Sequence, residues 1–65
     1  MSVLVNGRMQ NLPEPPTLAA LLVALAPPIP FAVACNGEFV PLANYAGCEI
    51  QQGDYIDIVH PAAGG

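Results

Sequence analysis

The stretch TLAALLVALAPP, residues 17–28, predicts a helix around which the rest of the fold is arranged. Thr17 is suited to the N-cap because its hydroxyl accepts a hydrogen bond from a backbone N–H of the first turn. Pro27 and Pro28 cannot continue a helix, so we expect it to end before them. A single helix with one apolar stripe covers one face of a sheet, which favours an α+β fold. The stripe consists of residues spaced at i, i+3, i+4 and i+7: Leu18, Leu21, Leu22 and Leu25.

The opposite side of this helix is also without charge, although a solvated helix face normally carries charged residues. Two interpretations stay open. The favoured one is that alanines stand there as good helix formers. The other is that a second molecule partly covers this face. The residues concerned are Ala19, Ala20, Val23, Ala24 and Ala26.

Two Asn-Gly pairs predict β-hairpins, one on each side of the helix. Asn-Gly between short apolar segments is the strongest local signal for a two-residue hairpin turn. Asn6-Gly7 lies within SVLVNGRMQNL, and Asn36-Gly37 lies within FAVACNGEFVP. The four predicted strands cover about residues 2–5, 8–12, 31–35 and 38–40.

The segment GDYIDIV, residues 53–59, predicts the last strand. Ile56 and Ile58 point to one face, whereas Tyr55, Asp57 and Val59 point to the other. The first and last strands contain no proline, so we expect them to lie parallel in the middle of the sheet. The segment between the second hairpin and the last strand has no clean period and is expected to be irregular. The predicted fold is therefore a mixed sheet of about four to five strands packed on one helix.

Composition limits the chain to one small domain and narrows its partners. The chain has 65 residues, of which 54% are hydrophobic and 9% charged, which argues for a compact core. Arg8 is the only arginine, there is no lysine, and the net charge is −4. Binding to a nucleic-acid backbone needs Lys and Arg, so we expect no nucleic-acid partner. An acidic surface favours basic patches on partner proteins.

The sequence gives little indication of a signal peptide or of a membrane-spanning helix. Residues 16–35 carry no charge, but prolines interrupt them, and a spanning helix needs ~20 suitable residues. The beginning of the sequence, MSVLVNGR, lacks the basic start and long apolar stretch of a signal peptide. We therefore expect a cytoplasmic protein that does not enter a membrane.

Side chains suited to catalysis or metal binding do not converge in the sequence. His60 is the only histidine. A catalytic set of nucleophile, base and orienting group needs three suitable side chains within reach of one another. Cys35 and Cys48 are interpreted as small, half-buried apolar residues; a disulfide between them would suit an oxidising compartment. Glu49 and Asp54 are interpreted as turn residues. We expect no catalysis by the chain alone, no metal and no bound cofactor.

The segment PAAGG, residues 61–65, follows the last strand without a linker. Chance or a cloning remnant also produces a Gly-Gly ending. However, five residues extend up to ~16 Å, and small side chains let a backbone enter a narrow site. The reactive group would then be the α-carboxylate of Gly65, which needs activation by another protein before it reacts as an acyl donor.

Three segments together carry a family resemblance: VACNGEFVP, TLAALLVAL and GDYIDIVHPAAGG. In this order and length, they resemble the bacterial sulfur-carrier proteins of thiamine biosynthesis, which have a ubiquitin-like β-grasp fold. The resemblance covers essentially the whole chain. It implies a β-grasp domain over residues 1–60 and a flexible tail over residues 61–65.

The resemblance also implies a function. A partner adenylating enzyme would use ATP to activate Gly65, and a sulfur-donor protein would convert it to a thiocarboxylate. The thiocarboxylate would then donate sulfur to a thiazole synthase. Gly64, Ala63 and Ala62 would thread into the partner sites, and the free chain would be a monomer. Docking would use a sheet face that includes Phe39, Tyr55 and Val59.

One departure and three alternatives accompany this resemblance. Leu42 stands where the family commonly has a basic residue after Val-Pro, so a charged contact there is in doubt. The small, sulfur-carrying subunit of molybdopterin synthase shares the fold and tail chemistry, but is typically longer. Sulfur carriers for amino-acid synthesis are a close variant. A ubiquitin-like interaction or conjugation module is the third alternative. The sequence contains no lysine, so copies of this protein could not be joined to one another through lysine side chains.

Overall fold

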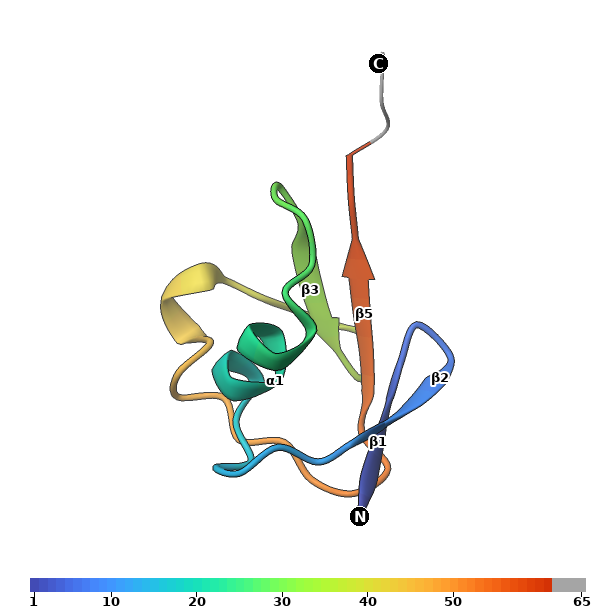
Figure 1. Cartoon of the computed structure of the whole chain (residues 1–65). Helices are drawn as coiled ribbons and strands as arrows, with labels where there is room; N and C mark the ends of the chain where they lie inside the picture. Colours follow the sequence, from blue (N-terminus) through green and yellow to red (C-terminus); the bar gives the residue numbers. More distant parts are fainter. Residues whose placement is uncertain (62–65) are drawn as a thin grey trace.

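A computed structural model describes residues 1–61 of the chain and contains one α-helix packed against a mixed sheet (Figure 1). The five strands have the order β2-β1-β5-β3-β4. The α+β prediction of a sheet on a single helix is thus confirmed. The elements are β1 (Ser2–Val5), β2 (Arg8–Asn11), α1 (Leu18–Leu25), β3 (Ala32–Cys35), β4 (Glu38–Val40), the 3-10 helix η1 (Leu42–Asn44) and β5 (Tyr55–Val59).

The centre of the sheet is a parallel pair formed by the first and last strands. Leu4 is opposite Tyr55 and Val5 is opposite Ile56, whereas every other strand pair is antiparallel. The predicted central position of β1 and β5 is therefore confirmed. Each of the two hairpins contributes one outer strand, so the sheet grows outward from this pair.

Both Asn-Gly pairs form the predicted hairpin turns. Asn6 and Gly7 have φ values of 51° and 85°, and Asn36 and Gly37 have values of 51° and 87°. Two successive positive φ values give a turn whose twist matches that of the flanking strands. Asn and Gly are the residues that adopt this conformation most readily, which explains why the local sequence predicts both turns.

Helix α1 has the predicted N-cap and ends just before the prolines. The Thr17 hydroxyl accepts a hydrogen bond of 3.1 Å from the N–H of Ala20. At the other end, Ala26 is left-handed with φ 48° and donates its N–H to the Leu22 carbonyl. Pro27 follows directly and cannot continue the helical hydrogen bonds.

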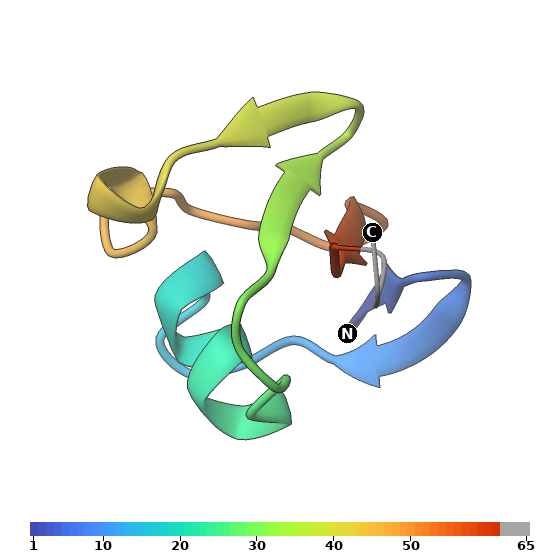
Figure 2. The ribbon, with the colours of Figure 1, turned by 90° about the horizontal axis from the view of Figure 1, so that it is seen from above.

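The core lies between α1 and the inner face of the sheet. Viewed from above, the sheet curls around one side of the helix (Figure 2). The leucine stripe is confirmed as the buried face, with Leu25 partly buried at its end. On the outer side of the helix, Val23 is 80% exposed. The buried residues are Val3, Val5, Leu18, Leu21, Leu22, Val33, Val40, Ile50, Ile56 and Ile58.

The irregular segment before β5 is attached to the start of α1. Its only regular element is η1, and an isolated bridge pairs Glu49 with Thr17. The Leu18 N–H donates to the Cys48 carbonyl at 2.9 Å, and the Ile50 N–H donates to Pro16 at 2.9 Å. These bonds place the segment beside the helix while its remaining backbone turns toward β5.

Candidate functional site

The end of β5 is the first part of the candidate site, because the chain leaves the sheet there. Ile56 and Ile58 face the core, and the strand ends at exposed Val59. His60 and Pro61 continue beyond it and are exposed. In Figure 1, β5 points toward the end of the molecule at which the described chain stops. The fold therefore presents the beginning of the predicted tail at its surface.

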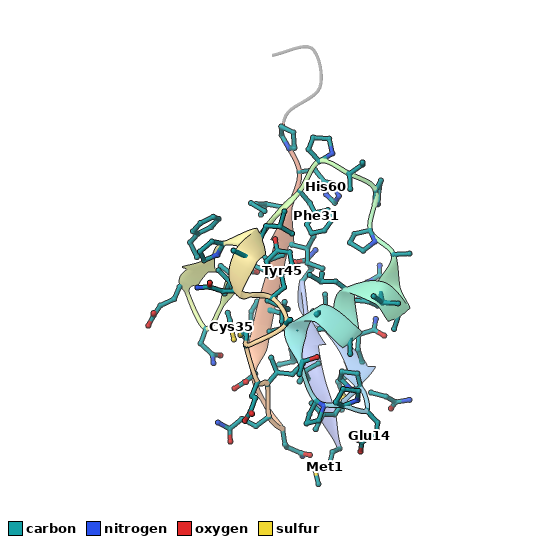
Figure 3. The ribbon with its side chains drawn as sticks, turned by 90° about the vertical axis from the view of Figure 1, so that its left-hand side faces the viewer. Met1, Glu14, Phe31, Cys35, Tyr45 and His60 are labelled. Atoms are coloured by element: carbon teal, nitrogen blue, oxygen red, sulfur yellow. The ribbon has the colours of Figure 1, made fainter. Side chains whose placement is uncertain are left out.

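His60 connects this exit point to the loop after α1. Its Nε2 atom lies 2.9 Å from the Pro28 carbonyl oxygen. A carbonyl only accepts, so Nε2 donates this hydrogen bond. The Phe31 ring packs edge-on against the imidazole, with ring centroids 6.3 Å apart and an interplanar angle of 62°. Figure 3 shows both rings at the end of the molecule where the chain leaves β5.

These two contacts were not foreseen from the sequence. The partners are 32 residues apart for the hydrogen bond, and no periodicity or turn signal links such distant positions. Together the two contacts link the residue after β5 to the proline-rich loop that follows α1.

The outer face of the sheet is the second part of the site. Phe39, Tyr55 and Val59 are 68%, 39% and 56% exposed. Small residues separate them: Ala34 pairs with Phe39, and Ala32 pairs with Val59. The three predicted docking residues therefore share the face away from the helix, because alternate residues of neighbouring strands point the same way.

The three residues are spread along the face rather than gathered at the tail. Val59 is next to the exit of the chain, but Tyr55 is four residues earlier, ~13 Å away along the strand. Asp57 lies between them and places a half-buried carboxylate in this apolar surface. Leu42, the residue that departs from the family pattern, is 78% exposed and contributes further apolar surface beside β4.

The acidic turn residues have structural contacts. Asp54 accepts a 2.9 Å hydrogen bond from the Gln51 N–H and a 3.1 Å bond from the Asn36 side-chain amide. Glu49 is exposed and takes part in the bridge with Thr17. Within residues 1–61 there is no cluster of three or more His, Cys, Asp or Glu that could hold a metal ion.

Several predictions concern the last residues, which lie outside the described part of the chain. These are the modification of Gly65, the threading of Gly64, Ala63 and Ala62, and the division between domain and tail. They stay predictions. In residues 1–61 no helix has the length and apolar character needed to cross a membrane.

Comparisons with known proteins agree with this fold. The crystal structure of a thiamine biosynthesis protein (ThiS) from Geobacter metallireducens matches with a TM-score of 0.80 and 22% identity, over 100% of both chains. At that identity the likeness establishes the shared fold. A search of curated protein sequences found no match. The model of the ThiS family matches residues 3–65, which is nearly the whole sequence including both final glycines. On this match, the chain belongs to the ThiS family.

Proposed function

We propose that this chain is a sulfur carrier of thiamine biosynthesis and that the carboxyl group of Gly65 carries the sulfur. The observation that carries the proposal is the family match, which extends through residue 65 and so includes the Gly-Gly pair. The exposed exit of β5 at His60 and Pro61 supports it. The protein of matching fold from Geobacter metallireducens is a thiamine biosynthesis protein, which agrees with the same pathway.

The proposed chemistry takes place at the carboxyl carbon of Gly65. A carboxylate is a poor acyl donor because its oxygen is a poor leaving group. A partner enzyme would therefore join the carboxylate oxygen to the α-phosphorus of ATP, with loss of pyrophosphate. A donor protein would supply sulfur as sulfide, which attacks the acyl carbon and displaces AMP, so that a C–S bond forms as the C–O bond to the phosphate breaks. The resulting thiocarboxylate is the sulfur source for a thiazole synthase.

The described part of the chain would hold the tail in place while the partners act on it. The His60 contacts with Pro28 and Phe31 attach the start of the tail to the domain. The apolar outer face offers a surface next to this point, where Phe39 and Val59 are more than half exposed. Large exposed apolar surfaces on small proteins commonly mark partner sites.

A mass measurement tests the central step. The full chain is incubated with a ThiS-adenylating enzyme, ATP and a sulfur donor, and its intact mass is followed. We expect a rise equal to the replacement of one oxygen by sulfur. Deletion of Gly65 should abolish both this rise and pyrophosphate release, because the activated carboxyl group is displaced. Modification of the deleted chain at the wild-type rate would contradict the proposal.

The Gly64→Leu variant tests threading separately from chemistry. A side chain at this position should block entry into a narrow site, so we expect loss of activation with unchanged domain stability. Val23→Leu is the matched control because Val23 is exposed on the helix, away from the outer sheet face. Normal turnover of Gly64→Leu would show that narrow entry is not required.

Charge substitutions test the docking face. Val59→Glu and Phe39→Glu should weaken binding to the adenylating enzyme, because each would place a charge in an apolar contact. Val23→Glu introduces the same charge on the helix side and should leave binding unchanged. Equal loss in all three variants would argue against docking through the outer face.

The choice of acceptor separates this function from its nearest alternative. The family match favours the thiamine carrier over the small subunit of molybdopterin synthase. Thiocarboxylated chain should therefore support thiazole formation by a thiazole synthase. Sulfur transfer to a pterin acceptor instead would assign the chain to the alternative.

A further inference from the structure

A cavity of about 550 Å³ lies between the β3–β4 hairpin and the segment after η1. Both cysteines of the chain line it, together with Phe39, Pro41 and Asn44. The cavity is on a different part of the molecule from the exit of the tail, as the positions of Cys35 and His60 show in Figure 3. The proposed sulfur-carrier function makes no use of either thiol.

The fold brings the two cysteines together although 12 residues separate them in the sequence. Cys35 ends β3 and packs against the core. Cys48 also packs against the core, and its carbonyl accepts the 2.9 Å hydrogen bond from Leu18. Cys48 is among the groups that raise the pKa of the Cys35 thiol, and both residues line the same cavity. Both are half-buried and free, so each is accessible from the cavity.

We propose that Cys35 and Cys48 form a reversible disulfide, made by thiol–disulfide exchange with a small disulfide that enters this cavity. The placement of the pair carries the proposal: two half-buried thiols, on separate backbone segments, that line one cavity. A disulfide would join the end of β3 to the segment after η1. The proposal does not depend on the tail or on its chemistry.

The order of attack follows from the surroundings of Cys35. Burial raises the pKa of its thiol, and the Asp54 carboxylate raises it further, with smaller contributions from Cys48 and Glu38. A raised pKa keeps Cys35 protonated at neutral pH, and the thiolate is the attacking species. In the proposed order, exchange begins at Cys48, and Cys35 completes it.

Exchange takes place in two steps. The Cys48 thiolate attacks one sulfur of the small disulfide, forms a mixed disulfide and releases one small thiolate. That thiolate takes the proton of Cys35, whose sulfur then attacks the Cys48 sulfur. The Cys48 bond to the small molecule breaks, and the second small thiolate leaves and takes a proton from solvent. The chain is oxidised by two electrons, and one disulfide is reduced to two thiols.

Charge determines which disulfides react fastest. Asp54 and Glu38 lie near Cys35, and the chain as a whole has a net charge of −4. Opposite charges attract and raise association rates. Cystamine, a dication, should therefore react faster than the neutral hydroxyethyl disulfide, and both should react faster than the anionic oxidised glutathione. We expect the cationic and anionic rates to differ by about tenfold at low salt, and by less at high salt.

The test follows the intact mass of the full reduced chain in excess cystamine. We expect a product that has lost two hydrogens and retains no cystamine half, and a peptide map that links Cys35 to Cys48. The product should return to the starting mass when a dithiol reductant is added. A folded chain that instead keeps two cystamine halves, or links only between molecules, would overturn the proposal.

Single variants separate the two steps. Cys35→Ala should stop at a mixed disulfide on Cys48, because the second thiol is missing. Cys48→Ala should react more slowly, because the raised pKa of the remaining Cys35 lowers its thiolate fraction. Urea unfolding of both variants verifies that they are folded under the conditions of the assay. Equal reaction rates in the two folded variants would refute the assigned order. A wild-type chain that carries one cystamine half on each thiol, as the two variants would together, would refute the pairing.

Discussion

The side-chain amide of Asn6 makes two hydrogen bonds to the backbone of Ile58. Its Oδ1 accepts from the Ile58 N–H at 2.8 Å, and its Nδ2 donates to the Ile58 carbonyl at 3.0 Å. The backbone pairing of β1 with β5 covers only two residue pairs. The Asn6 side chain therefore continues this pairing by one step, and it does so two residues before the chain leaves the sheet at His60.

The second hairpin contains a corresponding contact. The Asn36 Oδ1 accepts from the Tyr55 N–H at 2.9 Å, while its Nδ2 donates to the Asp54 carboxylate at 3.1 Å. Each Asn-Gly turn thus does two things. Its backbone reverses the chain, and its asparagine side chain attaches the hairpin to β5.

Removal of the Asn6 amide should destabilise the domain. In Asn6→Gly the turn keeps a residue that accepts positive φ, so the loss reports the two hydrogen bonds together with the greater flexibility of glycine in the unfolded chain. We expect the free energy of unfolding to fall by about 1–3 kcal/mol, because backbone groups of β5 lose their partners. Urea unfolding followed by circular dichroism measures this change. A variant as stable as the wild type would show that water replaces the amide without cost.

Ala26→Gly should stabilise the domain. Ala26 adopts φ 48° at the C-cap of α1, a left-handed conformation that costs a residue with a Cβ roughly 1–2 kcal/mol. Glycine adopts it without that cost, although its unfolded state is more flexible. We expect a net gain of about 0.5–1 kcal/mol in the free energy of unfolding. Ala24→Gly, inside the same helix, is the control and should be destabilising.

His60→Ala should weaken the use of the tail without unfolding the domain. The substitution removes the hydrogen bond to Pro28 and the contact with Phe31. An exposed hydrogen bond of this kind contributes about 0.5–1.5 kcal/mol, so kcat/KM for adenylation should fall by roughly 2- to 10-fold. The same assay applied to His60→Gln provides the comparison, since its amide can donate to the same carbonyl. Equal rates for wild type and His60→Ala would remove any role of His60 in positioning the tail.

The stability of the reduced chain should decrease at alkaline pH, in part through Cys35. The pKa of this thiol is raised from its ordinary value of 9.0 by burial and by Asp54. The folded state therefore favours the protonated thiol, and this contribution is complete below pH 9.0. It is lost as the pH rises through the folded-state pKa. Unfolding curves of wild type and Cys35→Ala across the neutral to alkaline range should show a smaller alkaline decrease in the variant.

Local patterns in the sequence predict most of the fold, and for physical reasons. The leucine spacing of α1 requires one buried face, and the prolines after it remove the donors that a longer helix would need. The two Asn-Gly pairs predict tight turns because few other residue pairs accept two positive φ values. The apolar strands that flank these turns then have few ways to cover a single helix. For the site, strand alternation placed Tyr55 and Val59 on one side of β5, and the family resemblance added Phe39 to the same docking face.

Contacts between distant segments were decided only by the tertiary structure. Asn6 bonds to Ile58, His60 bonds to Pro28, and Cys35 lines one cavity with Cys48. In each case the two residues belong to different segments of the chain. A sequence pattern reports which face of its own helix or strand a residue occupies, because that depends on neighbours a few positions away. Which distant residue it touches depends on the order of the strands and the curvature of the sheet. The sequence by itself thus determined the elements and their buried faces, whereas the tertiary packing decided how β5 is attached at its end and which two thiols share a cavity.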